Sequence, residues 1–186
     1  MARSIRDPKR FVHLAVDLVN TARDGHDFMV TPYDLHAFLL ESGEPEPFDV
    51  NGTDVAEVLE LRGRLRRVFM ASSEDKAAKV LNEVLHESAT APYLSRHDEV
   101  GWHLHVAKPD AEWAEWLSAL TATGLAELVS GGGFDRMRVC AADACDRAFI
   151  DESRNHSQRF CCQSCATRTR VNAYRARQAP DGDEAF

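Results

Sequence analysis

The sequence lacks a long apolar run. No segment approaches the roughly 20 consecutive apolar residues that a membrane-spanning helix needs, so we expect no membrane contact. The first ten residues, MARSIRDPKR, are charged, and no apolar run of sufficient length follows them. They therefore do not resemble a secretory signal peptide. Together these two absences predict a protein of the reducing cytoplasm.

Cysteine is absent from most of the chain. All five cysteines fall within residues 140–178, which read CAADACDRAFIDESRNHSQRFCCQSCATRTRVNAYRARQ. In a reducing compartment, clustered cysteines are more often metal ligands than disulfide partners. The odd number fits a site with four ligands and one spare cysteine.

Two close cysteine pairs predict a structural zinc site. Four residues separate Cys140 from Cys145, three separate Cys161 from Cys165, and fifteen lie between the pairs. Four thiolates form a closed tetrahedron with no open position for substrate, and zinc would supply about 10–16 kcal/mol toward folding so small a unit. Cys162 also precedes Cys165, at the commoner two-residue spacing, so spacing alone leaves Cys161 and Cys162 as alternatives.

The formal net charge of −8 is unevenly distributed. Residues 136–178 contain nine arginines against four acidic residues, a net charge of +5, which leaves −13 on the rest of the chain. This asymmetry predicts a basic binding module on an acidic body. Alternatively, the arginines serve only to keep a small domain solvated, and the negative charge of the zinc-bound thiolates offsets part of their positive charge.

The N-terminal part of the chain is predicted to be mainly helical. With 186 residues, 44% of them hydrophobic, the chain can form one ordinary domain and a small satellite. Apolar residues recur at helical spacing in residues 11–23, 33–42, 54–71, 73–85 and from 110 onward. Thr31 is expected to cap the second of these helices, with Pro32 in its first turn. We expect Arg62, Arg64, Arg66 and Arg67 to be surface charges. We expect Gly124 to weaken the middle of the helix that begins at residue 110.

A β-hairpin is expected between these helices. Residues 93–96 and 102–106 flank the turn-like segment 97–101 and alternate like strands. Trp102 and Leu104 would face one way, and His103 and His105 the other. No third ligand is evident for this His-x-His pair, so we expect two half-exposed histidines rather than a catalytic metal site.

The fold class follows as α+β, with a small treble-clef-like zinc-finger domain after the helical one. Three consecutive glycines mark the joint. We divide the chain into a helical domain with a β-hairpin, a Gly-rich linker, a zinc finger with a basic C-terminal helix, and a frayed acidic tail, at residues 1–130, 131–135, 136–180 and 181–186. Within the finger we expect one strand around Phe149 and Ile150, a return strand at residues 159–161, and a final helix from residue 166.

The final helix is the predicted partner-binding element. Val171 and Tyr174 form a narrow apolar stripe flanked on both sides by arginines. Guanidinium groups bind phosphate oxygens in a bidentate manner, which indicates nucleic-acid contact by Arg168, Arg170, Arg175, Arg177, Arg154 and Arg159. Alternatively, Val171 and Tyr174 pack inward and the arginines extend into solvent. Treble clefs also serve protein and RNA partners.

Residues 140–168 resemble the CGNR zinc-finger family of bacterial proteins, which are regarded as transcriptional regulators. Its pattern is matched by the first two cysteines, by Phe149, and by the segments Asp151-Glu152-Ser153-Arg154-Asn155, Phe160-Cys161 and Cys165-Ala166-Thr167-Arg168. The resemblance makes Cys161 the third zinc ligand and places Cys162 where the family usually has serine. Ala166 and Thr167 replace the Gly and Asn of the signature, and the spacing before Cys165 is one residue shorter than in many members.

The first 130 residues or so resemble the ABATE domain that usually precedes this finger. The cues are Leu18-Val19-Asn20-Thr21 and, after it, Thr31-Pro32-Tyr33-Asp34-Leu35. The resemblance implies a mainly helical domain with a hairpin, proposed to sense stress or a ligand. We therefore expect a DNA-binding regulator with one structural Zn²⁺, whose N-terminal domain senses a small-molecule effector or forms a homodimer.

Two other functions compete with this one. The finger could serve only protein or RNA partners. The chain could also be an enzyme with a site around His103, His105 and Asp17, but it shows no nucleophile motif, phosphate loop or second ligand set. The polar residues Asp17, Asn20 and Asp24 could line a pocket, but we expect them to form a solvated helix face. We expect no enzymatic activity.

Overall fold

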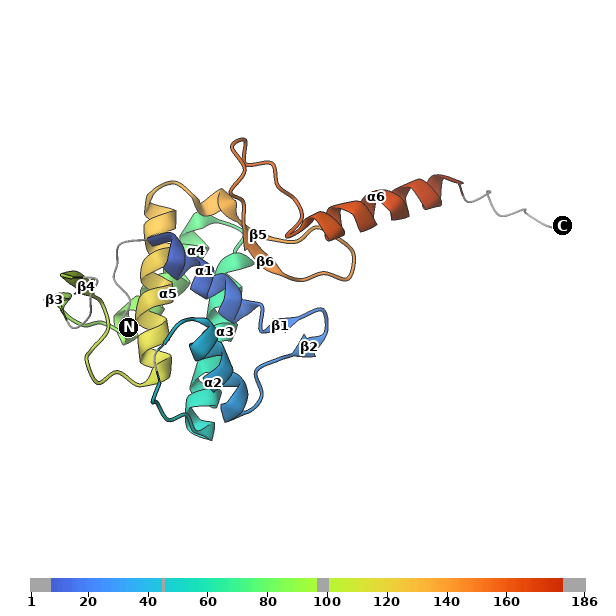
Figure 1. Cartoon of the computed structure of the whole chain (residues 1–186). Helices are drawn as coiled ribbons and strands as arrows, with labels where there is room; N and C mark the ends of the chain where they lie inside the picture. The colour runs from blue at the N-terminus through green and yellow to red at the C-terminus, as the bar shows by residue number, and fades with distance from the viewer. Residues whose placement is uncertain (1–7, 45, 97–100, 179–186) are drawn as a thin grey trace.

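Figure 1 shows the computed structural model of the chain, which describes residues 8–44, 46–96 and 101–178. The body is built from five helices: α1 (Pro8–Val19), α2 (Pro32–Glu41), α3 (Gly52–Phe69), α4 (Glu74–Glu87) and α5 (Trp113–Ser130). Helix α3 contacts each of the other four helices, so it forms the centre of the bundle, and α5 packs against α1, α3 and α4. The predicted mainly helical N-terminal region with a small hairpin is confirmed.

Local capping explains where two of these helices begin. The Thr31 hydroxyl accepts a hydrogen bond from the Asp34 backbone N–H, and the Asp34 carboxylate accepts one from the Thr31 N–H. Asn51 and Asp54 make the same reciprocal pair at the start of α3. Such capping boxes satisfy backbone donors that the first turn leaves unpaired. The Thr31 cap was predicted, whereas α3 begins earlier than expected because Asn51 caps it.

The first helix is shorter than predicted. It ends at Val19, and β1 (Ala22–Arg23) pairs with β2 (His26–Asp27) in an antiparallel hairpin. The turn between them is Asp24-Gly25, with φ of 53° and 79°. Two consecutive positive φ angles at Asp-Gly are typical of a two-residue hairpin turn. The expected helix to residue 23 was therefore wrong, because the turn chemistry outweighs the apolar spacing.

Gly124 allows two helices to approach closely. A Cβ atom at this position would lie 2.6 Å from Phe11 Cβ and 2.9 Å from the Val12 backbone nitrogen. Phe11 and Leu125 are buried in the same apolar core. The glycine thus places α1 against α5, and its effect in the middle of α5 is more than a loss of helix propensity.

The expected second hairpin is present. Strand β3 (Tyr93–Ser95) pairs antiparallel with β4 (His103–His105), and residues 97–100 of the predicted turn lie outside the described residues. The expectation of two half-exposed histidines is wrong for His103, whereas His105 is partly exposed. His103 is buried, with 3% of its surface exposed, whereas Trp102 and Leu104 are exposed. The alternation was right, but sequence could not show which face meets the bundle.

The second half of the chain packs directly on the helical body. After the short 3₁₀ helix η1 (Phe134–Arg136), strand β5 (Met137–Val139) pairs antiparallel with β6 (Ala148–Ile150). Strand β6 packs on α1 and β5 on α3, and Met137 and Ala148 belong to the core of the body. The return strand expected at residues 159–161 is absent from the described structure, because β6 pairs with the preceding segment instead.

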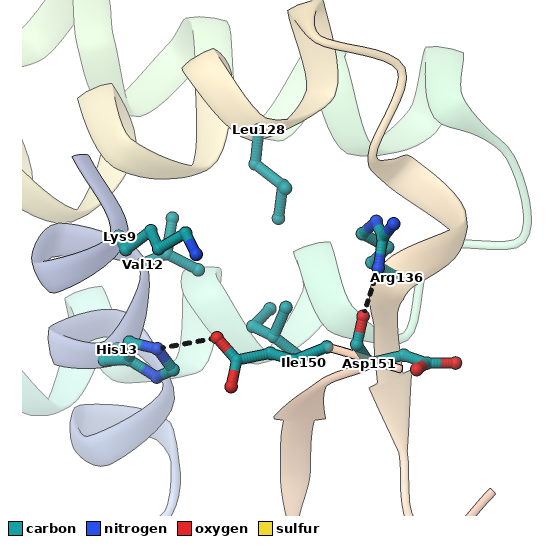
Figure 2. A pocket seen from close by; sticks show the side chains of 8 residues that line it. Lys9, Val12, His13, Leu128, Arg136, Ile150 and Asp151 are labelled. Carbon is teal, nitrogen blue, oxygen red and sulfur yellow. Dashed lines mark hydrogen bonds and ion pairs between the residues drawn. The ribbon is translucent and has the colours of Figure 1, made fainter. Parts of the chain in front are cut away.

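The last helix, α6 (Gln163–Gln178), projects away from the body (Figure 1). A cavity lies where the turn after β6 meets α1 and the end of α5 (Figure 2). Across the described ranges, no helix is long and apolar enough to cross a membrane.

Candidate metal centre

The first two cysteines lie in the loop that joins β5 to β6. Cys140 follows β5, and its backbone N–H donates to the Arg147 carbonyl at 2.9 Å, which continues the hairpin pairing by one residue. The Cys145 N–H donates to the Ala142 carbonyl at 3.1 Å, and Ala144 takes a positive φ of 56°. This tight turn brings both sulfur atoms to the same side of the loop.

The other two cysteines lie at the start of α6. Cys161 precedes the helix, and its backbone N–H points to Cys140 Sγ at 3.4 Å. Cys165 is in the first turn of α6 and is buried. The N-terminus of a helix favours negative charge, but at Cys165 burial outweighs this effect and raises the pKa of the thiol.

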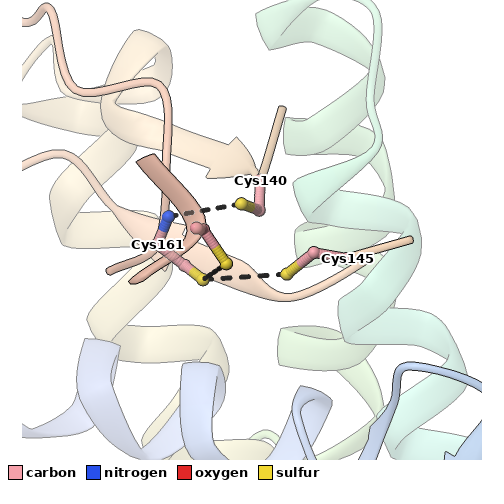
Figure 3. Close-up of side chains that lie close together, drawn as sticks. Cys140, Cys145 and Cys161 are labelled. Atoms are coloured by element: carbon pink, nitrogen blue, oxygen red, sulfur yellow. Dashed lines mark hydrogen bonds between the residues drawn. The ribbon is translucent and has the colours of Figure 1, made fainter. Parts of the chain in front are cut away.

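These four cysteines form one compact cluster (Figure 3). All four Sγ atoms lie within 4.8 Å of one another. Cys161 Sγ is 3.8 Å from both Cys145 Sγ and Cys165 Sγ. A tetrahedron with Zn–S bonds of about 2.3 Å has S···S edges of about 3.8 Å, so the donor set and its spacing fit one structural zinc ion.

The electrostatics of the cluster explain why it needs a cation. Burial and the neighbouring sulfur atoms raise the pKa of Cys161 and of Cys165, the latter to about 12. Four thiols so close together cannot all ionise on their own, because each thiolate repels the next. A divalent ion reverses this balance by coordinating the deprotonated sulfur atoms.

Cys162 lies beside the cluster but outside the group of four. Its Sγ is 3.9 Å from Cys161 Sγ and 3.0 Å from Ser164 Oγ. The Ser164 hydroxyl, followed by the Cys165 backbone N–H, lowers the pKa of the Cys162 thiol to about 6. The geometry thus groups the cysteines as the family resemblance does, and not as two-residue spacing alone would.

Asp151 organises the turn between the two cysteine pairs. Its fully buried carboxylate accepts hydrogen bonds from the Ser153 hydroxyl and backbone N–H and from the Gln158 backbone N–H. Burial opposes ionisation of this carboxyl, but these hydrogen bonds prevail and lower its pKa. The Asp-x-Ser segment of the motif therefore shapes the turn that leads to Cys161.

Asn20 joins the cysteine loop to the helical body, a role that sequence reasoning missed. Its side-chain amide donates to the Ala148 carbonyl and accepts from the Ala148 N–H, both at 2.9 Å. It thus acts as a strand partner at the edge of β6. The Leu-Val-Asn-Thr cue contained this residue, but its partner lies 128 residues away.

Ion pairs hold the same loop. Arg147 bonds the Asp24 carboxylate at 2.8 Å, and the hydrogen bond from Arg147 lowers the pKa of Asp24. Arg66 bonds both the carboxylate and the carbonyl of Asp146. The expectation that Asn20 and Asp24 form a merely solvated face, and Arg66 a merely surface charge, was wrong because the finger packs on them.

Two further α3 arginines also have defined partners. Arg62 binds both carboxylate oxygens of Asp27, at 2.7 and 2.6 Å. Arg64 pairs with Glu87 of α4. Arg67 is exposed, as expected. The arginines of α3 therefore connect it to β2, α4 and the finger.

The six arginines expected to contact nucleic acid are all exposed. Four of them lie on α6: Arg168, Arg170, Arg175 and Arg177. Arg168 also reaches back to the Asp143 carbonyl at 3.2 Å, beside the cysteine cluster. Arg154 and Arg159 lie on the segment before α6. Val171 and Tyr174 are 40% and 59% exposed, so they do not pack inward as the alternative interpretation required.

The histidines of the β3–β4 hairpin are not part of the metal centre. His103 Nδ1 lies 2.9 Å from the Gly101 carbonyl, and its ring is tilted against that of His105, with the centroids 4.7 Å apart. Within the described ranges, the four cysteines are the one group of ligand-type residues close enough to hold a metal ion. Asp17 lies elsewhere and lines a separate cavity with Asn20 and Arg23.

Comparison with known families identifies both parts of the chain. The ABATE family model, described as "Putative stress-induced transcription regulator", matches residues 12–132. The CGNR zinc-finger model matches residues 136–178, which contain the whole cysteine cluster. A search of curated proteins found no match. Both predicted resemblances are confirmed, and the cluster is the centre of a CGNR finger that holds one structural zinc.

Proposed function

The chain belongs to the ABATE family, and from this membership, its zinc centre and its exposed basic helix we propose that it is a transcription regulator that contacts duplex DNA through α6. The proposal also includes DNA contacts by Arg154 and Arg159, which precede α6. Zinc would act structurally, by fixing the start of α6 against the cysteine loop.

The exposure and charge of α6 carry this proposal. The helix has four arginines and no acidic residue, and nearly all of its side chains beyond Cys165 are exposed. At 100° per residue, the four arginines, Val171 and Tyr174 occupy one half of the helix surface. Small residues such as Ala173 and Ala176 occupy the other half. The half of the α6 surface that carries the arginines could therefore contact the phosphates of both DNA strands at once.

The dimensions of α6 also suit duplex DNA. A helix of 16 residues is about 24 Å long, and the major groove is about 12 Å wide and admits one α-helix. Arginines on the two shoulders would bind phosphates on both sides, and Val171 and Tyr174 would face the base edges. The acidic body repels DNA, which favours approach by the finger alone.

The N-terminal domain would supply the regulatory input. We assign it no reaction, because its histidines and Asp17 form no common site in the described structure. It would instead sense a small molecule or form a homodimer. A single finger usually needs a second half-site or added contacts for sequence specificity.

A protein or RNA partner is the second candidate for the same surface. The exposed Tyr174 ring favours it, since aromatic side chains stack on unpaired bases and anchor protein interfaces. The two candidates differ in their response to duplex DNA, which the following experiment measures.

The test compares duplex affinity of the zinc-loaded full chain with that of Arg170→Ala/Arg175→Ala. Both arginines are exposed and lie beyond the cysteine cluster. Losing two phosphate contacts should weaken binding at least about tenfold and reduce the salt slope by about 2, while zinc content stays at one per chain. Arg67→Ala, an exposed arginine of the body, is the matched control and should change nothing. Unchanged affinity in the double variant would exclude α6 as the DNA-binding element.

A further inference from the structure

Helix α6 is held at its beginning. It projects away from the body (Figure 1), and nearly all of its side chains beyond Cys165 are exposed. Its direction relative to the body therefore depends on contacts made by its first two turns. One of these contacts is the cysteine cluster itself, through Cys165, and another is made by Arg168, one turn further along the helix.

The Arg168 guanidinium bridges the two halves of the metal centre. Its Nη2 donates a hydrogen bond to the Asp143 carbonyl at 3.2 Å and lies 3.8 Å from Cys165 Sγ. Asp143 lies between Cys140 and Cys145 in the loop after β5. The arginine thus links the first cysteine pair to the second by a route that does not pass through the metal.

The position of Arg168 on α6 follows from helix geometry. Residues three apart in an α-helix are neighbours on one face, which places Arg168 beside Cys165. Long side chains in a helix point toward its N-terminus, so the guanidinium reaches back over the first turn, where the cysteines lie. Arg170 lies on another face of the helix. Arg175 and Arg177 lie about 15 and 18 Å further along the axis than Cys165, so neither can make this contact.

The zinc centre offers negative charge to this guanidinium. Four thiolates outweigh the charge of one divalent ion, so the loaded centre is a net anion. Two other arginines bond the same region, but each is neutralised by a carboxylate. Arg147 pairs with Asp24, and Arg66 pairs with Asp146. Among the described residues Arg168 pairs with no carboxylate, since its Nη2 contacts a carbonyl and a sulfur. Its charge is therefore available to the thiolates.

We propose that Arg168 serves the zinc centre, as a positioning residue, rather than a DNA phosphate. Its N–H stabilises the negative charge on the Cys165 sulfur, and its bond to the Asp143 carbonyl fixes the start of α6 against the cysteine loop. The other three arginines of α6 then remain for phosphates. The role toward zinc does not rest on the proposed function, whereas this division of the arginines does.

Competition with a chromophoric chelator measures the zinc affinity of the full chain and its variants. Groups that orient metal ligands typically contribute about 10–100-fold to metal affinity, so Arg168→Ala should weaken zinc binding by at least about tenfold. Arg168→Lys keeps the charge but lacks the planar fork, and should recover part of the loss. Arg67→Ala, an exposed arginine of α3, is the matched control and should leave zinc affinity unchanged. Unchanged zinc affinity in Arg168→Ala would overturn the proposal.

Cobalt substitution separates the contact to sulfur from a merely structural role. Co²⁺ bound to thiolates absorbs by charge transfer from sulfur, and a hydrogen bond to the sulfur raises the energy of this transition because it stabilises the thiolate lone pairs. In the chain loaded with excess Co²⁺, Arg168→Ala should therefore move the band to longer wavelength, and Arg168→Lys should move it less. Weaker metal binding with an unmoved band would leave only the bond to the Asp143 carbonyl and would rule out the role toward sulfur.

The salt dependence of duplex binding tests the division of the arginines. At saturating zinc, Arg170→Ala should reduce the salt slope by about 1, as the loss of one phosphate contact predicts. Arg168→Ala should leave the slope unchanged, because its zinc site is then filled. A slope reduced by about 1 in Arg168→Ala with normal zinc affinity would make Arg168 a phosphate contact, against the proposal. A chain that binds zinc but no duplex would contradict the proposed function, and the zinc measurements would still decide the role of Arg168.

Discussion

The sulfur atoms of Cys161 and Cys162 differ in where they point, although the residues are neighbours. Cys161 Sγ lies 3.8 Å from two other thiols of the cluster, whereas Cys162 is close to Ser164 at the surface. The paired spacing alone could predict four ligands but not which neighbour turns inward, whereas the family resemblance selected Cys161, which the structure places in the cluster. That depends on how the chain enters α6, which spacing does not specify.

Single Cys→Ser variants test this choice. Cys140→Ser, Cys145→Ser, Cys161→Ser and Cys165→Ser should each lose zinc, because three thiolates leave the tetrahedron open. Cys162→Ser should retain one zinc per chain and is the matched control, since the family usually has serine there. Metal content after gel filtration is the measurement. Zinc loss in Cys162→Ser with retention in Cys161→Ser would reverse the assignment.

Asn20 is one of the residues that hold the finger on the body. Asn20→Ala leaves the N–H and carbonyl of the buried Ala148 without partners. Each unsatisfied buried group costs about 1–3 kcal/mol, so for these two groups we expect the free energy of unfolding to fall by about 2–6 kcal/mol in urea titration. Asn172→Ala, on the exposed face of α6, is the control and should change it by less than about 0.5 kcal/mol. Equal effects would show that the Asn20 pair contributes no stability.

At the scale of elements, helix caps and hairpins could be predicted where the interacting residues are close in sequence. The Thr31 cap and the β3–β4 hairpin were predicted because their signals lie within a few residues. The Asp24-Gly25 turn also indicated the β1–β2 hairpin, but we predicted a helix to residue 23 from the apolar spacing. The β5–β6 pairing could not be predicted, because the loop that carries Cys140 and Cys145 separates the two strands.

Two glycines in helices predict opposite outcomes. Gly124→Ala inserts a Cβ atom 2.6 Å from Phe11 Cβ and should lower the free energy of unfolding by about 1–3 kcal/mol, despite better helix propensity. Gly63→Ala, in α3, has no atom within 4 Å of the new Cβ and should raise it by up to about 1 kcal/mol. Urea titration of both variants is the measurement. A gain of stability in Gly124→Ala would contradict the close packing of α1 on α5.

At the scale of the whole molecule, the charge asymmetry was visible in the sequence and the packing was not. The finger carries the positive charge, and its hairpin shares the core of the acidic body through Met137 and Ala148. Nothing in either segment alone identifies the other as its partner, since the contacts join residues far apart in the sequence, such as Arg66 with Asp146, 80 positions apart, and Asn20 with Ala148, 128 positions apart. The division into separate domains at residues 131–135 stays a prediction.

This packing predicts how zinc removal affects the molecule. Chelation should disrupt the cysteine loop and also loosen β5 and β6, which contribute to the core. We therefore expect the thermal midpoint of the whole chain to fall by several degrees, as about 1 kcal/mol shifts a domain of this size by about 2–4 °C. Calorimetry of the zinc-loaded and chelated chain measures it. An unchanged midpoint for the body would show that the finger folds independently of it.

The central claim is that the zinc-ordered helix α6 binds duplex DNA. The most direct measurement is duplex affinity of the full chain across a salt series, with and without a zinc chelator. For four to six arginine–phosphate contacts, log K should fall against log salt with a slope of about −3.6 to −5.4, and the chelator should abolish binding. No binding at low salt, or binding that persists unchanged without zinc, would contradict the account.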